Sequence, residues 1–137
     1  MTVRDIMTHY TETASPEETV LQARDRFRAG NFRHLPVVEG DRLLGVVSDR
    51  DVLRAAGPSL GLNEFEPDVG TNIDRPLREI MTRDIVTADP LMSVEEAADT
   101  MLQHDVSALP VLDEGRLVGI VTTADLLRLT AGYEREY

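Results

Sequence analysis

The feature that most constrains this chain is an internal repeat that contains no gaps. Residues 3–54 align with residues 77–128 at a constant offset of 74 positions, and 20 of the 52 aligned positions are identical. A repeat of this length corresponds to one supersecondary unit, and such a unit buries its apolar face against a neighbouring copy. The chain is therefore predicted to fold as two copies of one α/β (α+β) unit, packed as a pseudo-twofold pair.

Each copy carries the pattern of the element order β-α-β-β-α, preceded in the first copy by a short helical turn at 3–8. Apolar runs separated by Gly-containing loops predict hairpins, and the apolar spacing after residue 20 predicts an amphipathic helix. The expected elements of the first copy are an extended segment at 11–13, a helix, strands at 34–38 and 42–47, and a helix at 49–56. In the second copy we expect strands at 108–112 and 116–121 and a helix at 123–129.

Two capping-box patterns compete for the start of the first long helix. SPEE at 15–18 forms one pattern, and TVLQ at 19–22 forms the other. The second copy has only one good pattern, SVEE at 93–96, and it aligns with TVLQ. We therefore predict that the helix begins at Val20.

The repeat divides the chain into three parts. Residues 1–56 form the first repeat, residues 57–76 a linker, and residues 77–137 the second repeat with a C-terminal tail. The linker contains apolar residues besides Gly and Pro, so it is expected to pack over the pair. No apolar run is long enough to span a membrane, and the start of the chain does not resemble a signal peptide. Together with the absence of cysteine, these features lead us to expect a cytoplasmic protein.

The charge of the chain bears on its possible partners. The net charge is −11 at neutral pH, which disfavours non-specific binding to nucleic acids or membranes. Aromatic residues are few and tryptophan is absent, so the chain has no platform for stacking single-stranded bases. Neither nucleic acid nor membrane is expected as a partner.

The most informative motif occurs at 45–51 and again at 119–125. It consists of glycine, two apolar residues, Ser or Thr, two variable residues and Asp, in that order. Each copy lies where a strand should lead into a helix, so its hydroxyl and carboxylate form a capping-box pattern. A capping box prefers the longer Glu or Gln, however, and Asp is also a good acceptor for ribose hydroxyls. A helix N-terminus also favours anions. The cap and the ligand site are compatible interpretations, and both stay open.

The set of motifs resembles a tandem pair of CBS domains (a Bateman module), as found in stand-alone CBS domain-containing proteins. The resemblance extends over nearly the whole chain, from Val3 to the region of Leu129. The shared motifs, each present twice and in the same order, are IMT at 6–8 and 80–82, LPV at 35–37 and 109–111, and the motif ending in Asp.

The resemblance implies binding of an adenosine compound (AMP, ADP, ATP or S-adenosylmethionine) in clefts between the repeats. In the family, the motif Asp holds the ribose hydroxyls, the motif Ser or Thr approaches ribose or phosphate, and the segment after the MT opening borders the adenine. The residues that correspond to the ribose-binding Asp are Asp51 and Asp125, and those that correspond to the Ser or Thr are Ser48 and Thr122. The segment that borders the adenine corresponds to Thr11, Thr13, Ala14, Ile85, Thr87 and Ala88. Ile6, Met7, Ile80 and Met81 are either apolar walls of these sites or plain core.

The two copies differ in charge. The first has eight Arg against nine acidic residues, and the second has four Arg against ten. Immediately before the LPV strand, the first copy has Arg33 and His34, where the second has Ser107 and Ala108. The alternative interpretation of Arg33 and His34 is that they are ordinary solvated residues.

In related modules, such as the gamma subunit of AMP-activated protein kinase, a basic pair at this place contacts the phosphate of a nucleotide whose ribose lies on the other repeat. The resemblance therefore implies that the stronger site uses Thr122 and Asp125 for ribose and Arg33 and His34 for phosphate. The site on Ser48 and Asp51 is expected to be empty or to take a ligand with little negative charge.

Three classes of function were weighed. The leading one is a regulatory, energy-sensing module that forms a homodimer and transmits the level of its ligand to an unidentified partner protein. The second is a ligand-free scaffold for dimerisation or interaction. An enzyme is not expected, because Ser48 has no evident base, the histidines lack metal-ligand spacing, and no Walker or dinucleotide glycine loop occurs. We expect no catalytic residue, metal or catalytic cofactor.

Overall fold

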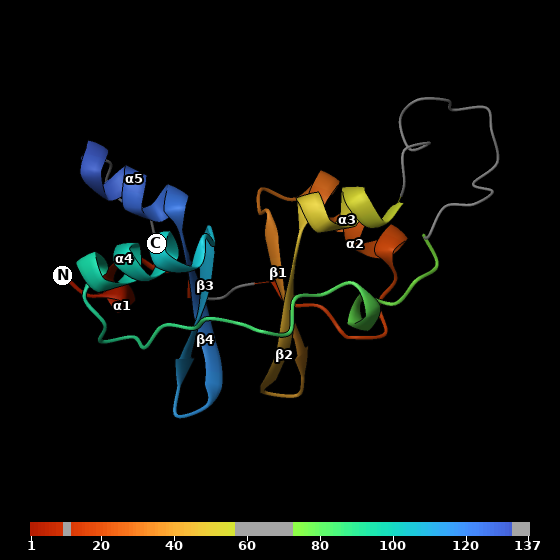
Figure 1. The fold of residues 1–137 in the computed structure, drawn as a ribbon, viewed down its shortest axis with the longest axis horizontal. Helices are drawn as coiled ribbons and strands as arrows, with labels where there is room; N and C mark the ends of the chain where they lie inside the picture. The colour runs from red at the N-terminus through yellow and green to blue at the C-terminus, as the bar shows by residue number, and fades with distance from the viewer. Residues whose placement is uncertain (10–11, 57–72, 133–137) are drawn as a thin grey trace. The chain divides into compact units, whose positions relative to one another are not determined.

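The computed structural model describes residues 1–9, 12–56 and 73–132 (Figure 1). It divides into two compact units, which are described separately. Unit 1 comprises Met1–Thr11 and Val86–Tyr137, and unit 2 comprises Glu12–Ile85. These units do not coincide with the sequence repeats, because each repeat gives its opening segment to the other unit.

Backbone hydrogen bonds define this exchange. In unit 1, helix α1 (Val3–Ile6) leads to Thr8, which exchanges two bonds with Ile120 of the second repeat, at 2.9 and 3.0 Å. In unit 2, the 3₁₀ helix η1 (Leu77–Glu79) leads to Thr82, which exchanges the same two bonds with Val46 of the first repeat, at 2.9 and 3.0 Å. The repeat pattern alone did not show which copy each opening segment would contact.

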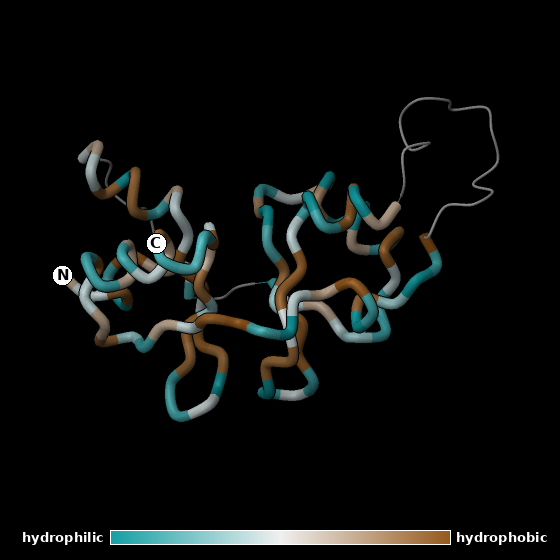
Figure 2. Tube along the Cα trace, in the orientation of Figure 1, coloured by the Kyte–Doolittle hydropathy of each residue, from teal (hydrophilic) through white to brown (hydrophobic). Residues whose placement is uncertain are grey.

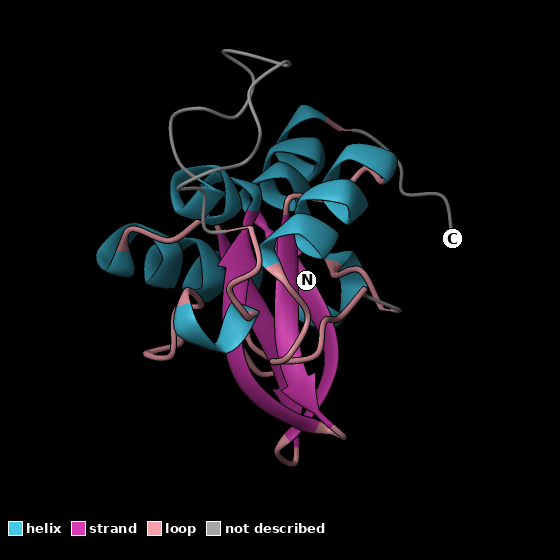
Figure 3. Ribbon diagram, turned by 90° about the vertical axis from the view of Figure 1, so that its right-hand side faces the viewer, coloured by secondary structure: helices cyan, strands magenta, loops and turns pink. Residues whose placement is uncertain are grey.

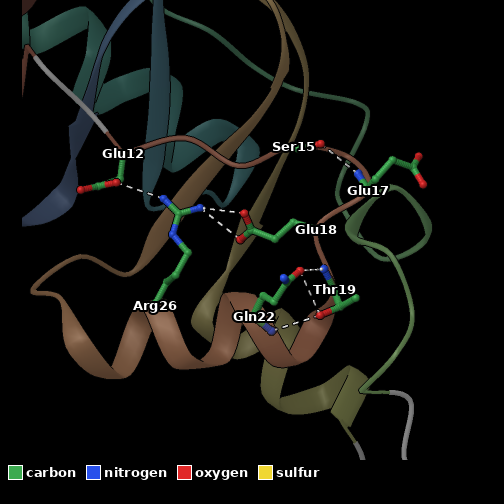
Figure 4. Close-up of polar contacts among 7 residues, drawn as sticks. All are labelled: Glu12, Ser15, Glu17, Glu18, Thr19, Gln22 and Arg26. Carbon is green, nitrogen blue, oxygen red and sulfur yellow. Dashed lines mark hydrogen bonds and ion pairs between the residues drawn. The ribbon is translucent and has the colours of Figure 1, made fainter.

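Unit 2 consists mainly of a helix, a hairpin and a second helix: α2 (Val20–Ala29), β1 (His34–Glu39), β2 (Arg42–Ser48) and α3 (Asp49–Ala56). Helix α2 begins at Val20 as predicted. Its N-cap Thr19 accepts a bond from the Gln22 N–H at 3.2 Å, and Gln22 Oε1 accepts one from the Thr19 N–H at 2.9 Å (Figure 4). The second of the two competing capping patterns is therefore the one used.

Unit 1 repeats this arrangement with α4 (Val94–His104), β3 (Ala108–Asp113), β4 (Arg116–Thr122) and α5 (Thr123–Ala131). The predicted strands of both hairpins end one residue short of those observed. Glu39 and Asp113 extend the first strands by pairing with Arg42 and Arg116, and the Ser or Thr of each motif extends the second strands by pairing with His34 or Ala108. Helix α5 runs two residues beyond the prediction and ends at Gly132, whose φ of 82° is left-handed, a conformation that glycine adopts readily.

The two hairpins have the same register. His34 lies opposite Ser48 and Ala108 opposite Thr122, and both sheets contain an irregularity at the equivalent place. The extended segment predicted at 11–13 forms no strand within the described residues. The strands drawn in Figure 3 are those of the two hairpins. Of the predicted segment and its continuation, only Ala14 joins the sheet, by a single parallel bridge to Val37, as Ala88 does with Val111. Because Ser15 and Pro16 lead into a turn, the chain leaves the sheet after one residue.

Each unit has its own apolar core. The strands of both hairpins contain runs of hydrophobic residues, which are brown in Figure 2. In unit 2, Leu35, Val37, Val47 and Leu77 are fully buried. Their equivalents in unit 1 are Leu109, Val111, Val121 and Val3, which are also fully buried. Burial of each such side chain stabilises the fold by about 1.5–3 kcal/mol.

The predicted packing of the linker lies mostly outside the described residues, as does the end of the tail. Of the linker, Ile73 is described, and its carbonyl accepts a bond from the Leu21 N–H of α2 at 3.0 Å. No helix among the described residues is long and apolar enough to cross a membrane.

Candidate functional site

The first copy of the motif closes the junction between β2 and α3. The Ser48 N–H donates to Asp51 Oδ2 at 2.9 Å, and the Asp51 N–H donates to Ser48 Oγ at 3.0 Å. These reciprocal bonds form a capping box, although Asp is shorter than the usual Glu or Gln. The capping interpretation is therefore confirmed at this junction.

The second copy does the same between β4 and α5. The Thr122 N–H donates to Asp125 Oδ2 at 2.8 Å, and the Asp125 N–H donates to Thr122 Oγ1 at 3.3 Å. The Thr122 hydroxyl also donates to the same carboxylate oxygen, at 3.1 Å. Both caps use Oδ2 of the aspartate.

The two aspartates differ in burial. The side chain of Asp125 is 5% exposed and that of Asp51 is 27% exposed. Asp125 is the one buried charged residue in the described part of the chain, and its Oδ1 lies 3.5 Å from Nη1 of Arg128. The two junctions therefore differ in how far the carboxylate of the motif is exposed to solvent.

The glycine of the motif is explained by packing. A Cβ placed on Gly45 would lie 2.6 Å from Sδ of Met81 and 2.8 Å from the Thr82 carbonyl oxygen. A Cβ on Gly119 would lie 2.5 Å from the Thr8 carbonyl oxygen and 3.0 Å from Sδ of Met7. The motif glycine therefore admits the opening segment to the sheet edge. Sequence reasoning missed this role, although the glycine's recurrence at the same place in both copies was a signal.

The predicted phosphate residues lie at the start of β1, in the same unit as Ser48 and Asp51. The guanidinium Nη1 of Arg33 lies 3.0 Å from Oδ2 of Asp49, and the Arg33 side chain is 79% exposed. His34 is partly buried opposite Ser48. Burial lowers the pKa of His34 below its ordinary value, and Arg33 lowers it further, while the charges of Asp49 and Asp51 oppose the shift. At neutral pH this imidazole is therefore mostly uncharged.

The second repeat has a neutral version of this corner. Ser107 precedes β3 and Ala108 is its first residue, and the Thr123 N–H donates to the Ser107 carbonyl at 2.9 Å. The Thr123 hydroxyl donates to the same carbonyl at 3.3 Å. The sequence predicts a difference in charge between the two repeats just before the LPV strand. In the structure, the charged and the neutral residues lie at equivalent positions of the two units.

The segment predicted to border adenine in unit 2 is held by a cluster of charges (Figure 4). Arg26 of α2 donates from Nη1 to both carboxylate oxygens of Glu18, at 3.0 and 3.1 Å, and from Nη2 to Glu12 at 3.0 Å. These bonds join α2 to both ends of the segment that contains Thr13 and Ala14. This cluster was not predicted from the sequence.

The other predicted adenine-bordering residues are distributed over both units. Ala14 and Ala88 are buried at their bridges, and Thr13, Ile85 and Thr87 are partly buried. Ile85 ends unit 2, whereas Thr87 and Ala88 belong to unit 1. Thr11 lies outside the described residues.

The residues considered as apolar walls belong to the cores. Ile6 and Met7 are buried in unit 1, Met81 is buried in unit 2, and Ile80 packs against that second core. Core packing is therefore confirmed for these side chains, and an additional contact with a ligand stays a prediction.

The structure brings together Ser48, Asp51, Arg33 and His34 in unit 2, and Thr122 with Asp125 in unit 1. The expected sharing of one ligand by Asp125 and Arg33 joins residues of two units and stays a prediction. Within residues 1–9, 12–56 and 73–132, no group of three or more His, Asp or Glu side chains could hold a metal ion.

A comparison with family models assigns these features. The model described as "CBS domain" matches residues 3–57 and 77–132. The chain belongs to the CBS domain family and carries a tandem pair of these domains. It is 35% identical over 125 residues to the CBS domain-containing protein YhcV of Bacillus subtilis, a match that spans 90% of this chain and 81% of that protein.

Solved structures of CBS domain pairs share the fold. The CBS domain pair of protein MJ0100, solved in complex with 5′-methylthioadenosine and S-adenosyl-L-methionine, matches with a TM-score of 0.80 and 29% identity over 96% of this chain and 97% of that one. Protein MJ1225 of Methanocaldococcus jannaschii, described as a proposed archaeal homolog of g-AMPK, matches with a TM-score of 0.76 and 34% identity. That match spans 94% of this chain but 47% of MJ1225.

Proposed function

We propose that this protein is a regulatory module that binds an adenosine compound and passes the level of that ligand to a partner protein. The observation that carries the proposal is the pair of equivalent junctions, each with a Ser or Thr hydroxyl and an Asp carboxylate fixed at a helix N-terminus. A carboxylate held by its cap is already oriented, so it binds a ribose diol at little cost in side-chain entropy. The adenosine ligands of the MJ0100 domain pair support the ligand class.

The candidate ligands are AMP, ADP, ATP and S-adenosylmethionine. We propose that ribose binds to Thr122 and Asp125, and that Arg33 and His34 contact the phosphate of the same ligand. The burial of Asp125 and the basic character of Arg33 support this assignment. A second, weaker position on Ser48 and Asp51 would take a ligand with little negative charge.

Calorimetry and thermal-shift measurements with adenosine, AMP, ATP and S-adenosylmethionine test the proposal. A ligand that binds the native state raises the melting temperature. Asp125→Asn keeps an oxygen for the cap but removes the charge, so we expect it to weaken binding about 10-fold or more, and Asp51→Asn to weaken it less. Equal effects of the two variants would overturn the assignment of the stronger site.

The alternative is a scaffold that binds no ligand, and a specific observation favours it: both motifs already serve as helix caps. Absence of a thermal shift with all four compounds at millimolar concentration would select this alternative. Dimerisation belongs to either function. We propose that the chain forms a homodimer, which light scattering would detect.

A further inference from the structure

The contact between Arg33 and Asp49 has a consequence for the choice of ligand. Asp49 is the first residue of α3, and its N–H donates to the Arg33 carbonyl at 3.0 Å. The same two residues also form an ion pair, with 3.0 Å between Nη1 and Oδ2. The backbone bond places the carboxylate beside the guanidinium that is proposed to meet phosphate.

The second repeat shows that the fold does not need this ion pair. Thr123 and Ser107 occupy the equivalent positions and keep the backbone bond, at 2.9 Å, without any charge. An ion pair as exposed as that of Arg33 contributes only about 0–1 kcal/mol to stability. The carboxylate of Asp49 therefore adds little to the fold, whereas its charge lies where an anionic ligand would bind.

We propose that Asp49 determines specificity by competing with ligand phosphate for Arg33. The inference rests on the proposed function and refines its ligand class. A phosphate that approaches Arg33 must displace the carboxylate and also bear its repulsion, and both effects grow with the negative charge of the ligand. Asp49 therefore reduces the gain in affinity that a ligand obtains from its phosphates, and it does so more for ATP than for AMP.

The test compares the affinities of adenosine, AMP and ATP for Asp49→Asn and for the unmodified chain, by calorimetry at low salt. Loss of one charge near phosphate should strengthen AMP binding by about 3- to 10-fold and ATP binding by more, while adenosine changes by less than about twofold. The matched control is Glu39→Gln, which removes one charge at the other end of β1, about 17 Å from His34 along the strand, and should strengthen AMP and ATP binding much less than Asp49→Asn does. An equal gain for adenosine and ATP in Asp49→Asn would overturn the inference.

A double-mutant cycle identifies Arg33 as the group for which Asp49 competes. In an Arg33→Gln background, the fold increase in AMP affinity caused by Asp49→Asn should be smaller, by a factor of about three or more, than in the unmodified chain. Only the direct repulsion between Asp49 and the phosphate is then relieved. An unchanged effect of Asp49→Asn would overturn the competition.

Pyrophosphate separates failure of this inference from failure of the proposed function. Its binding is followed by the NMR signals of the Arg33 side chain and the His34 ring. If no adenosine compound binds but Asp49→Asn strengthens pyrophosphate binding, the proposed function fails and the competition stands. If adenosine and AMP bind but Asp49→Asn changes neither AMP nor pyrophosphate, the competition fails and the proposed function stands. If nothing binds to either protein, both are overturned.

Discussion

At the scale of single residues, one side chain serves structure and candidate function at once. Asp125 caps α5 through Oδ2 and is also the residue that we propose to contact ribose. The recurring spacing of hydroxyl and carboxylate predicted the cap, and the resemblance to CBS domains implied the ribose contact. They did not predict the difference in burial between Asp125 and Asp51, since that depends on what packs around each helix.

His34 should make the stability of the protein depend on pH. Its pKa in the folded chain lies below the ordinary value of 6.5, mainly because of burial, so the unfolded chain binds the proton more readily. The contribution of uncharged His34 to the free energy of unfolding is therefore complete above pH 6.5. It is lost as the pH falls through 6.5 toward the lower pKa of the folded chain. The slope cannot exceed about 1.4 kcal/mol per pH unit for one proton. Denaturant unfolding of the protein and of His34→Gln, from about pH 7.5 to about pH 5.5, measures the difference.

An NMR titration of the His34 ring provides the control. The charged groups that shift the pKa of this ring include Asp49, Asp51 and Arg33. Because Asp49 raises the pKa, Asp49→Asn should lower it further. A pKa above 6.5 in the unmodified protein would contradict the prediction.

At the scale of elements, the repeat allowed the start of α2, both hairpins and both motif helices to be predicted closely. Local signals sufficed because capping boxes and Gly-containing loops act within a few residues. The first strand of each copy was overestimated, since Ala14 makes one bridge before the chain turns. The contacts that hold the segment around Ala14 in place were not predictable from the sequence either. In unit 2, Arg26 holds it, whereas the equivalents of Glu12 and Glu18 in unit 1 are Val86 and Met92, which pack on the core.

The charge cluster predicts a local loss of order in unit 2. Arg26→Met keeps the apolar stem but leaves Glu18, whose side chain is 17% exposed, without its bidentate partner. We expect a loss of about 1–2 kcal/mol in the free energy of unfolding, and a smaller loss at high salt. Amide exchange at Ala14 and Val38 should quicken, because their bonds join this segment to β1.

Arg28→Met on the exposed side of the same helix is the matched control for Arg26→Met. It should cost less than about 0.5 kcal/mol. Equal losses for the two variants would show that the cluster does not hold the segment.

At the scale of the whole chain, sequence order and compact structure divide the molecule differently. The repeat predicts two similar halves, and the structure contains two similar cores, but each core includes the opening segment of the other repeat. Val3 and Leu77 are equivalent in sequence and fully buried. Val3 packs with the strands of the second repeat, and Leu77 with those of the first.

This exchange predicts that a core substitution in one repeat loosens the hairpin of the other. Val3→Ala should speed amide exchange in β3 and β4, and Leu77→Ala should do so in β1 and β2, because each removes methyl groups from that core. We expect losses of about 1–3 kcal/mol for Val3→Ala and about 2–5 kcal/mol for Leu77→Ala. Residue-resolved hydrogen exchange measures both effects, since sub-global openings report on contiguous structural units. Faster exchange in β1 and β2 on Val3→Ala, with β3 and β4 unchanged, would contradict the exchanged arrangement. Each variant serves as the control for the other, because the two positions are equivalent and only the core that they enter differs.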